Sequence, residues 1–161
     1  MISANSLSHV KIGILPSLAR HYILRCSIAG GNSLASDATP VIDIHIHIQP
    51  LHAYKPHALA LIQKGRRDYP EVERYSADAK LFLNFLDEAG IERAGLINYV
   101  SPEVIGFPPE VNDWITSYCC ADPARLLAFG SVHPKYVPDA GAEVDRLAHL
   151  GIRGLKVHPS H

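Results

Sequence analysis

Three features are missing from this chain of 161 residues: a long apolar run, an excess of basic residues and a set of paired cysteines. No uninterrupted apolar stretch approaches the roughly 20 residues that a helix needs to cross a bilayer. Fifteen Lys and Arg residues against sixteen Asp and Glu residues give a net charge of −1, which provides no broad basic surface for a phosphate backbone. Cysteine occurs only at Cys26, Cys119 and Cys120, and an odd number does not suggest a disulfide scaffold. We therefore expect a soluble, cytoplasmic protein without nucleic-acid or membrane partners.

The remaining composition, with 47% hydrophobic residues, is typical of a globular domain with its own core. Residues 1–40 differ from the rest, because no acidic residue occurs up to Ser36 while three basic residues stand among seven serines. This composition is similar to that of an organelle transit peptide. The alternative is a poorly ordered extension, or translated sequence upstream of the domain. The domain itself is predicted to span residues 41–161.

The segment from Val41 to His47 alternates apolar and polar residues. If it is a β-strand, Asp43, His45 and His47 line one face and isoleucines line the other. Neighbouring side chains on one face are about 6.5–7 Å apart, so two imidazoles that lean together can share a metal ion at about 2.0–2.1 Å per nitrogen. His45 and His47 are therefore candidate metal ligands. The same alternation is also typical of an antiparallel strand with one wet face, on which histidines have no special role.

Strands and helices are predicted to alternate from residue 41 onward. Apolar residues recur at helical spacing after Ser76-Ala77-Asp78, after Pro108-Pro109 and after Pro138-Asp139, and glycines end two of these helices. In the last helix Ala140, Val144 and Leu147 are expected to face inward. The strands are predicted at residues 41–47, 93–99, 126–133 and 152–158. Such alternation implies parallel strands with right-handed crossovers, and the predicted fold is α/β, half of a TIM barrel with about four strands.

Ligands of parallel α/β folds bind at the carboxyl ends of the strands, where His45 and His47 stand. The connection that follows, residues 48–75, exceeds the 2–6 residues that are usual for such loops and indicates a binding loop or lid. It carries the basic run Lys64-Gly65-Arg66-Arg67. A solvated surface excursion is the alternative.

The fourth predicted strand supplies a second cluster. Gly154, Lys156 and His158 share one face, which places Lys156 and His158 toward the barrel interior. A lysine there needs a partner or a solvated cavity, because an unpaired buried ammonium is costly. His158 is either part of the site or a structural imidazole.

Three motifs accompany the predicted strands: IDIHIH at 42–47, FGSVHP at 129–134 and GIRGLKVHP at 151–159. In these motifs the chain resembles the amidohydrolase superfamily, in particular the branch that contains aminocarboxymuconate-semialdehyde decarboxylase. The resemblance implies a (β/α)8 barrel with a divalent metal, most often zinc, held by His45 and His47. It implies hydrolysis of a C–N or C–O bond in a small-molecule substrate, or non-oxidative decarboxylation. Asp43 is expected to orient the ligands, and Lys156 and His158 to lie near the substrate.

The chain departs from that family in length. A full barrel has eight strands and about 250 residues, whereas four strands are predicted here. The family's further ligands, a histidine on the fifth strand and an aspartate on the eighth, have no counterpart, and two histidines alone hold zinc weakly. The open edges of strands 1 and 4 invite pairing with another chain. We expect the chain to be an interrupted gene product. The alternatives are one half of a split barrel, completed by a partner chain, and a half-barrel that dimerises. The competing function is that of an inactive fragment that acts only in assembly.

Overall fold

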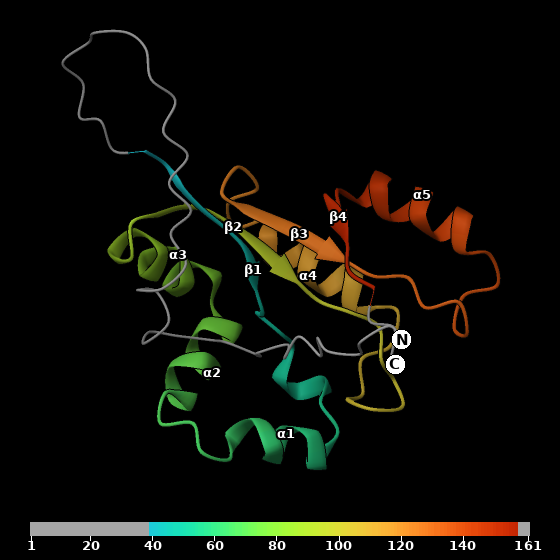
Figure 1. Ribbon diagram of the computed structural model, residues 1–161, viewed down its shortest axis with the longest axis horizontal. Coiled ribbons are helices and arrows are strands. Elements are labelled where there is room, and N and C mark those ends of the chain that lie inside the picture. The colour runs from blue at the N-terminus through green and yellow to red at the C-terminus, as the bar shows by residue number, and fades with distance from the viewer. Residues whose placement is uncertain (1–38, 158–161) are drawn as a thin grey trace, which may run out of the picture.

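Four parallel strands form one curled sheet, a half-barrel with helices between its strands, in the computed structural model, which describes residues 39–157 (Figure 1). The strands lie in chain order: β1 (Val41–Ile46), β2 (Ile91–Ile97), β3 (Leu126–Gly130) and β4 (Gly154–Leu155). The predicted fold class is confirmed. The predicted N-terminal extension, apart from its last two residues, and His158 lie outside the described residues.

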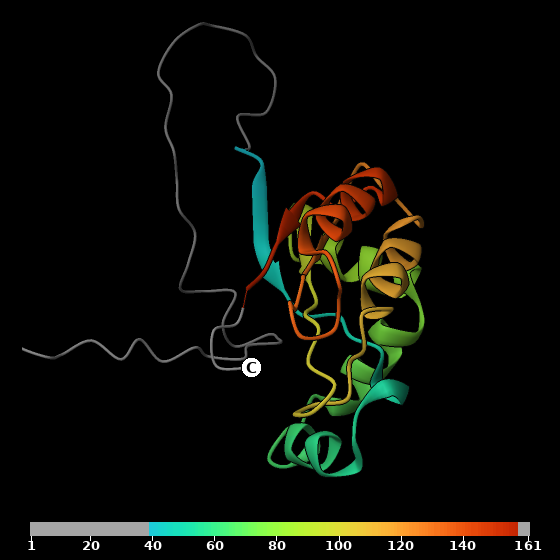
Figure 2. The same ribbon diagram turned by 90° about the vertical axis from the view of Figure 1, so that its right-hand side faces the viewer.

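Helices cover one face of the sheet, and in Figure 2 they all lie to one side of it. The three crossover helices are α3 (Ala79–Glu88), α4 (Val111–Cys119) and α5 (Ala140–Leu150). Two begin at predicted caps, because the carboxylates of Asp78 and Asp139 accept hydrogen bonds from backbone N–H groups of the first turn, at 2.8 and 3.0 Å. Within residues 39–157, no helix has the length and apolar content to cross a membrane.

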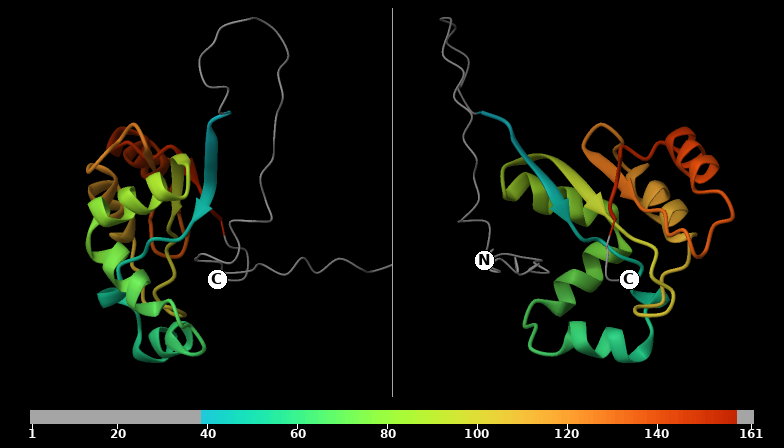
Figure 3. Two further views of the ribbon diagram at one scale, coloured as in Figure 1. Left: turned by 90° about the vertical axis from the view of Figure 1, so that its left-hand side faces the viewer. Right: turned by 45° about the vertical axis from the view of Figure 1, so that its right-hand side comes forward.

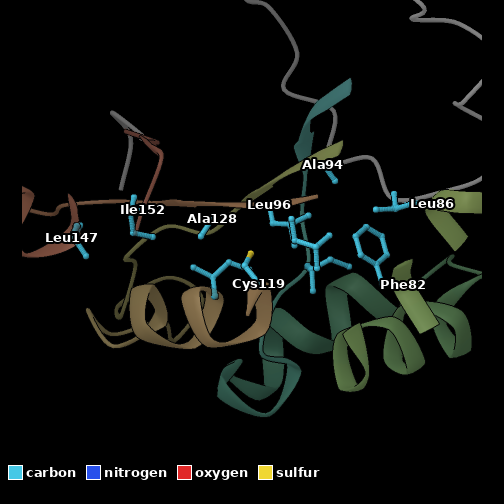
Figure 4. Close-up of a cluster of buried hydrophobic side chains, with 11 residues drawn as sticks. Phe82, Leu86, Ala94, Leu96, Cys119, Ala128, Leu147 and Ile152 are labelled. Carbon is cyan, nitrogen blue, oxygen red and sulfur yellow. The ribbon is translucent and has the colours of Figure 1, made fainter. Parts of the chain in front are cut away.

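The core lies between the sheet and these helices (Figure 4). Alternate residues of the central strands, Ala94 and Leu96 among them, pack against fully buried side chains of the helices, such as Phe82. The prediction that Val144 faces inward is wrong, since its side chain is 38% exposed. Helix α5 covers the end of the sheet beside the two-residue strand β4, and only Leu147 of that helix is buried in the core.

Strands β3 and β4 are shorter than predicted. Beyond Gly130 the side chain of Asn112 on α4 replaces a neighbouring strand: its Oδ1 accepts a hydrogen bond from the Ser131 N–H at 2.9 Å, and its Nδ2 donates to the Ser131 carbonyl at 2.9 Å. Strand β4 has β3 as its single neighbour within the described sheet. It ends after Leu155, although the Lys156 N–H still donates to the Gly130 carbonyl at 2.7 Å.

The long connection after β1 is folded and is not an extended lid. It forms a 3₁₀ helix η1 (Leu51–Ala53), then α1 (Pro56–Gln63) and α2 (Tyr69–Ala77). These elements lie beyond the carboxyl end of β1 (Figure 3). The connection after β2 anchors them, since the Lys55 N–H donates to the Ile105 carbonyl at 2.8 Å and the rings of Tyr54 and Phe107 meet edge to face.

Gly106 is the tightest point of this anchor, and we expect its replacement to be costly. Its φ is +107°, and a Cβ atom there would lie 2.5 Å from the Ala53 carbonyl oxygen. Gly90 also has a positive φ, +68°, but a Cβ atom there meets nothing within 4 Å. Gly90→Ala should therefore lower the free energy of unfolding by about 1–2 kcal/mol, and Gly106→Ala by about 2–5 kcal/mol, because overpacking adds to the backbone cost. Urea denaturation of both variants measures these free energies of unfolding. Equal losses of stability in the two variants would contradict the proposed role of Gly106 in anchoring the connection.

Candidate metal centre

Strand β1 does not keep the strict alternation that its sequence predicts. Asp43 pairs with Ala94 and Ile46 pairs with Leu96, so three steps on β1 match two steps on β2. This is a β-bulge. Because Ala94 and Leu96 face the helices, their partners Asp43 and Ile46 face that side too. The prediction that Asp43 shares a face with both histidines is therefore wrong.

Asp43 acts on the bulge through the backbone. Its carboxylate accepts a hydrogen bond from the N–H of His45 at 2.9 Å. A bulge leaves a backbone group unpaired in the strand ladder, and a short acidic side chain two residues earlier satisfies it locally. Asp43 thereby fixes the direction in which the chain presents His45, although within residues 39–157 its carboxylate is not hydrogen bonded to an imidazole.

The imidazole rings of His45 and His47 lie against each other at the carboxyl end of β1. Their Nε2 atoms are 3.2 Å apart and their ring centroids 5.1 Å apart. Two nitrogens bound to one tetrahedral zinc at about 2.0–2.1 Å are separated by about 3.3 Å. The pair therefore has the spacing of two ligands of a shared cation, and the same spacing suits a hydrogen bond in which one ring donates and the other accepts.

His47 is held in its neutral form. The side chain is 7% exposed, and burial, then the neighbouring His45, then Lys156 lower its pKa from 6.5 to about 4. A hydrogen bond to the backbone of Ile97 acts in the opposite sense and favours the protonated ring, but it is the smallest of these effects. A neutral imidazole is the form that binds metals.

Lys156 is the other predicted site residue that approaches the pair. Its ammonium group lies close enough to His47 to lower the pKa of that ring, because the curled sheet brings the end of β4 toward the end of β1. In the part of the chain that the structure describes, Lys156 forms no ion pair. The predicted partner on the same strand, His158, lies outside the described residues.

Sequence reasoning missed two residues that support the pair. Asn98 is fully buried, and its Nδ2 donates a hydrogen bond to the Ile48 carbonyl at 2.8 Å, next to His47. The ring of Tyr99 stands edge-on to that of His47, with centroids 6.3 Å apart. Both residues directly follow an apolar strand. Polar residues at the carboxyl end of a strand in a parallel sheet often belong to the site, so this position could have indicated their role.

The pair supplies fewer ligands than a complete zinc site. Among residues 39–157, no group of three or more His, Cys, Asp or Glu side chains is arranged to hold a metal ion. Catalytic zinc normally has three protein ligands and a water. Comparison of the chain with protein-family models, with curated proteins and with solved structures gives no match. The resemblance to the amidohydrolase superfamily therefore depends on the sequence motifs alone.

The burial of His47 predicts a pH-dependent stability in the metal-free protein. Between pH 6.5 and about 4 the unfolded chain binds a proton on His47 that the folded chain does not, so stability rises with pH across this window and is lost as the pH falls. At about 1.4 kcal/mol per pKa unit, the loss between pH 7 and pH 4 is on the order of 3 kcal/mol.

Chelator-treated protein should show this loss in urea denaturation at a series of pH values. His47→Asn should remove it, and His149→Asn, at an exposed position on α5, should keep it. An unchanged pH profile in His47→Asn would contradict the assignment.

Proposed function

We propose that this chain carries two histidine ligands of a divalent metal centre, most favourably zinc, in an amidohydrolase-type enzyme. The reaction class is hydrolysis of a C–N or C–O bond in a small-molecule substrate, with non-oxidative decarboxylation as the alternative reaction of the superfamily. One observation carries the proposal: Nε2 of His45 and Nε2 of His47 approach to 3.2 Å at the carboxyl end of β1. That end of a parallel α/β barrel is where active sites form.

The two imidazole nitrogens are suitable ligands for the proposed zinc ion, and they supply two of its ligands. Imidazole nitrogen is a good ligand for zinc, and a ring that stays neutral far below pH 7 does not lose its lone pair to a proton. A complete catalytic centre needs at least one more protein ligand. The resemblance assigns the remaining ligands to a fifth and an eighth strand, so full activity requires the second half of a barrel.

Each residue of the chain has a distinct part in this proposal. Burial keeps His47 neutral, and Asp43 fixes the backbone that presents His45. Lys156, a cation without an ion pair in the described residues, would contact the substrate. When bound, a divalent cation polarises a carbonyl and lowers the pKa of a coordinated water to about 7.

Zinc binding tests the proposal directly. The purified full chain should bind one zinc ion, and His45→Ala or His47→Ala should weaken that binding by at least about tenfold, because each variant removes a ligand. Calorimetric titration with zinc measures the affinity. His149→Ala is the matched control, since this exposed histidine lies on α5, and it should bind as the natural chain does. An unchanged zinc affinity in both His45→Ala and His47→Ala would contradict the proposal.

A second candidate function is an assembly role without catalysis. Seven large hydrophobic side chains are exposed among the described residues, and four of them lie on or beside the two edge strands: Ile42, Ile44, Leu155 and Val157. A second copy rotated by 180° about the barrel axis keeps every strand parallel and places β4 of each copy beside β1 of the other. Such a closed two-fold arrangement leaves no strand edge open.

Self-association tests this second candidate. Sedimentation at micromolar concentration should give twice the mass of the chain, and Ile44→Lys should give the monomer, because it places a charge on a side chain that is 64% exposed at the edge of the sheet. Leu61→Lys is the matched control: that side chain is 70% exposed but lies on α1. A monomeric natural chain, or equal dissociation by both substitutions, would contradict assembly through the sheet edges.

A further inference from the structure

The basic run at residues 64–67 contains one side chain whose surroundings are unusual. The Nη1 atom of Arg66 is buried and has no hydrogen-bond partner among the residues that the structure describes. A guanidinium always carries its charge and has five N–H donors. Leaving a buried donor of a charged group unpaired costs more than leaving a neutral one, and such a group in a folded protein calls for a specific explanation, an ion among them.

The phenol of Tyr54 lies near this guanidinium. Arg66 lies close enough to Tyr54 to lower the pKa of that phenol, against the stronger effect of burial, and Tyr69 acts on the same phenol. The Tyr54 hydroxyl is already engaged, since it donates a hydrogen bond to Oε1 of Gln49. Within residues 39–157 Arg66 forms no ion pair. The positive charge is therefore partly buried and is not balanced by a carboxylate of the described chain.

We infer that Arg66, in the turn between α1 and α2, binds a small oxyanion beside the phenol of Tyr54. Carboxylate and phosphate groups share the chemistry that this site selects: two oxygens that accept parallel N–H bonds from a planar fork. The flanking residues Lys64 and Arg67 are exposed and add positive potential that attracts an anion. This inference does not depend on the proposed metal centre, because no ligand of the metal takes part in it.

The position of the site is fixed by packing and not by a mobile loop. Tyr54 is held from one side by the ring of Phe107, 4.6 Å away between centroids, and from the other by Gln49. The backbone of Arg66 is itself tied down, since its N–H donates to the Gln63 carbonyl at 3.2 Å. An anion that binds here meets a guanidinium whose surroundings are already ordered, which lowers the entropic cost of binding.

Calorimetric titration of the full, chelator-treated chain with inorganic phosphate and separately with acetate tests the inference. The natural chain should bind at least one of them, and the anion that binds more tightly identifies the source. Arg66→Gln should weaken this binding by at least about tenfold, a change of about 1.4 kcal/mol. Arg66→Lys keeps the charge but loses the fork, and should also weaken it.

Arg67→Gln is the matched control, because it removes the same charge from the adjacent exposed position, and it should bind nearly as the natural chain does. An equal loss in Arg66→Gln and Arg67→Gln would overturn the inference in favour of a diffuse electrostatic attraction. Absence of binding by the natural chain to both anions would overturn it as well. In chloride buffer Arg66→Gln should be no less stable to urea than Arg67→Gln; a clearly less stable Arg66→Gln would show a purely structural role.

Discussion

The bulge in β1 is the constraint on which the rest of the candidate site depends. Without it, strict alternation would continue from Ile42 and place His45 on the same face as Asp43, toward the helices. The hydrogen bond from the His45 N–H to the Asp43 carboxylate satisfies the backbone at this irregular point. Gly95 makes room on the neighbouring strand, because a Cβ atom there would lie 2.9 Å from the backbone of Ile44. The geometry of the imidazole pair is thus a property of the backbone pairing between β1 and β2.

The uncovered face of the sheet is built around an aromatic ring. A Cβ atom on Gly95 or on Gly154 would meet the ring of Phe129 from either side, at 2.9 and 3.1 Å, so both glycines leave space for it. In a closed barrel this face would be filled by side chains from all strands. Here it is flanked by the exposed Ile42 and Ile44 on the edge strand β1.

Periodicity and end signals made the fold predictable from the sequence. The caps at Asp78 and Asp139 and the left-handed Gly151 mark helix ends through local chemistry that does not depend on the rest of the molecule. The convergence of His45 and His47 was predictable for the same reason, as a two-residue repeat on a strand. The bulge was not, because it depends on the register with β2, and neither was the early end of β3, which depends on Asn112 from a helix reached through the fold.

The groups that position the imidazole pair come almost entirely from the first two strands and the residues that follow them. Asn98 holds the backbone at Ile48 through a buried hydrogen bond, and Asp43 holds the backbone at His45 through an exposed one. These hydrogen bonds fix the backbone on both sides of the imidazole pair. Lys156 is the exception, since it reaches the site only through the curl of the sheet. A half-barrel of this kind can therefore present a preformed pair of imidazoles whose supporting contacts lie within the described strands and the residues that follow them.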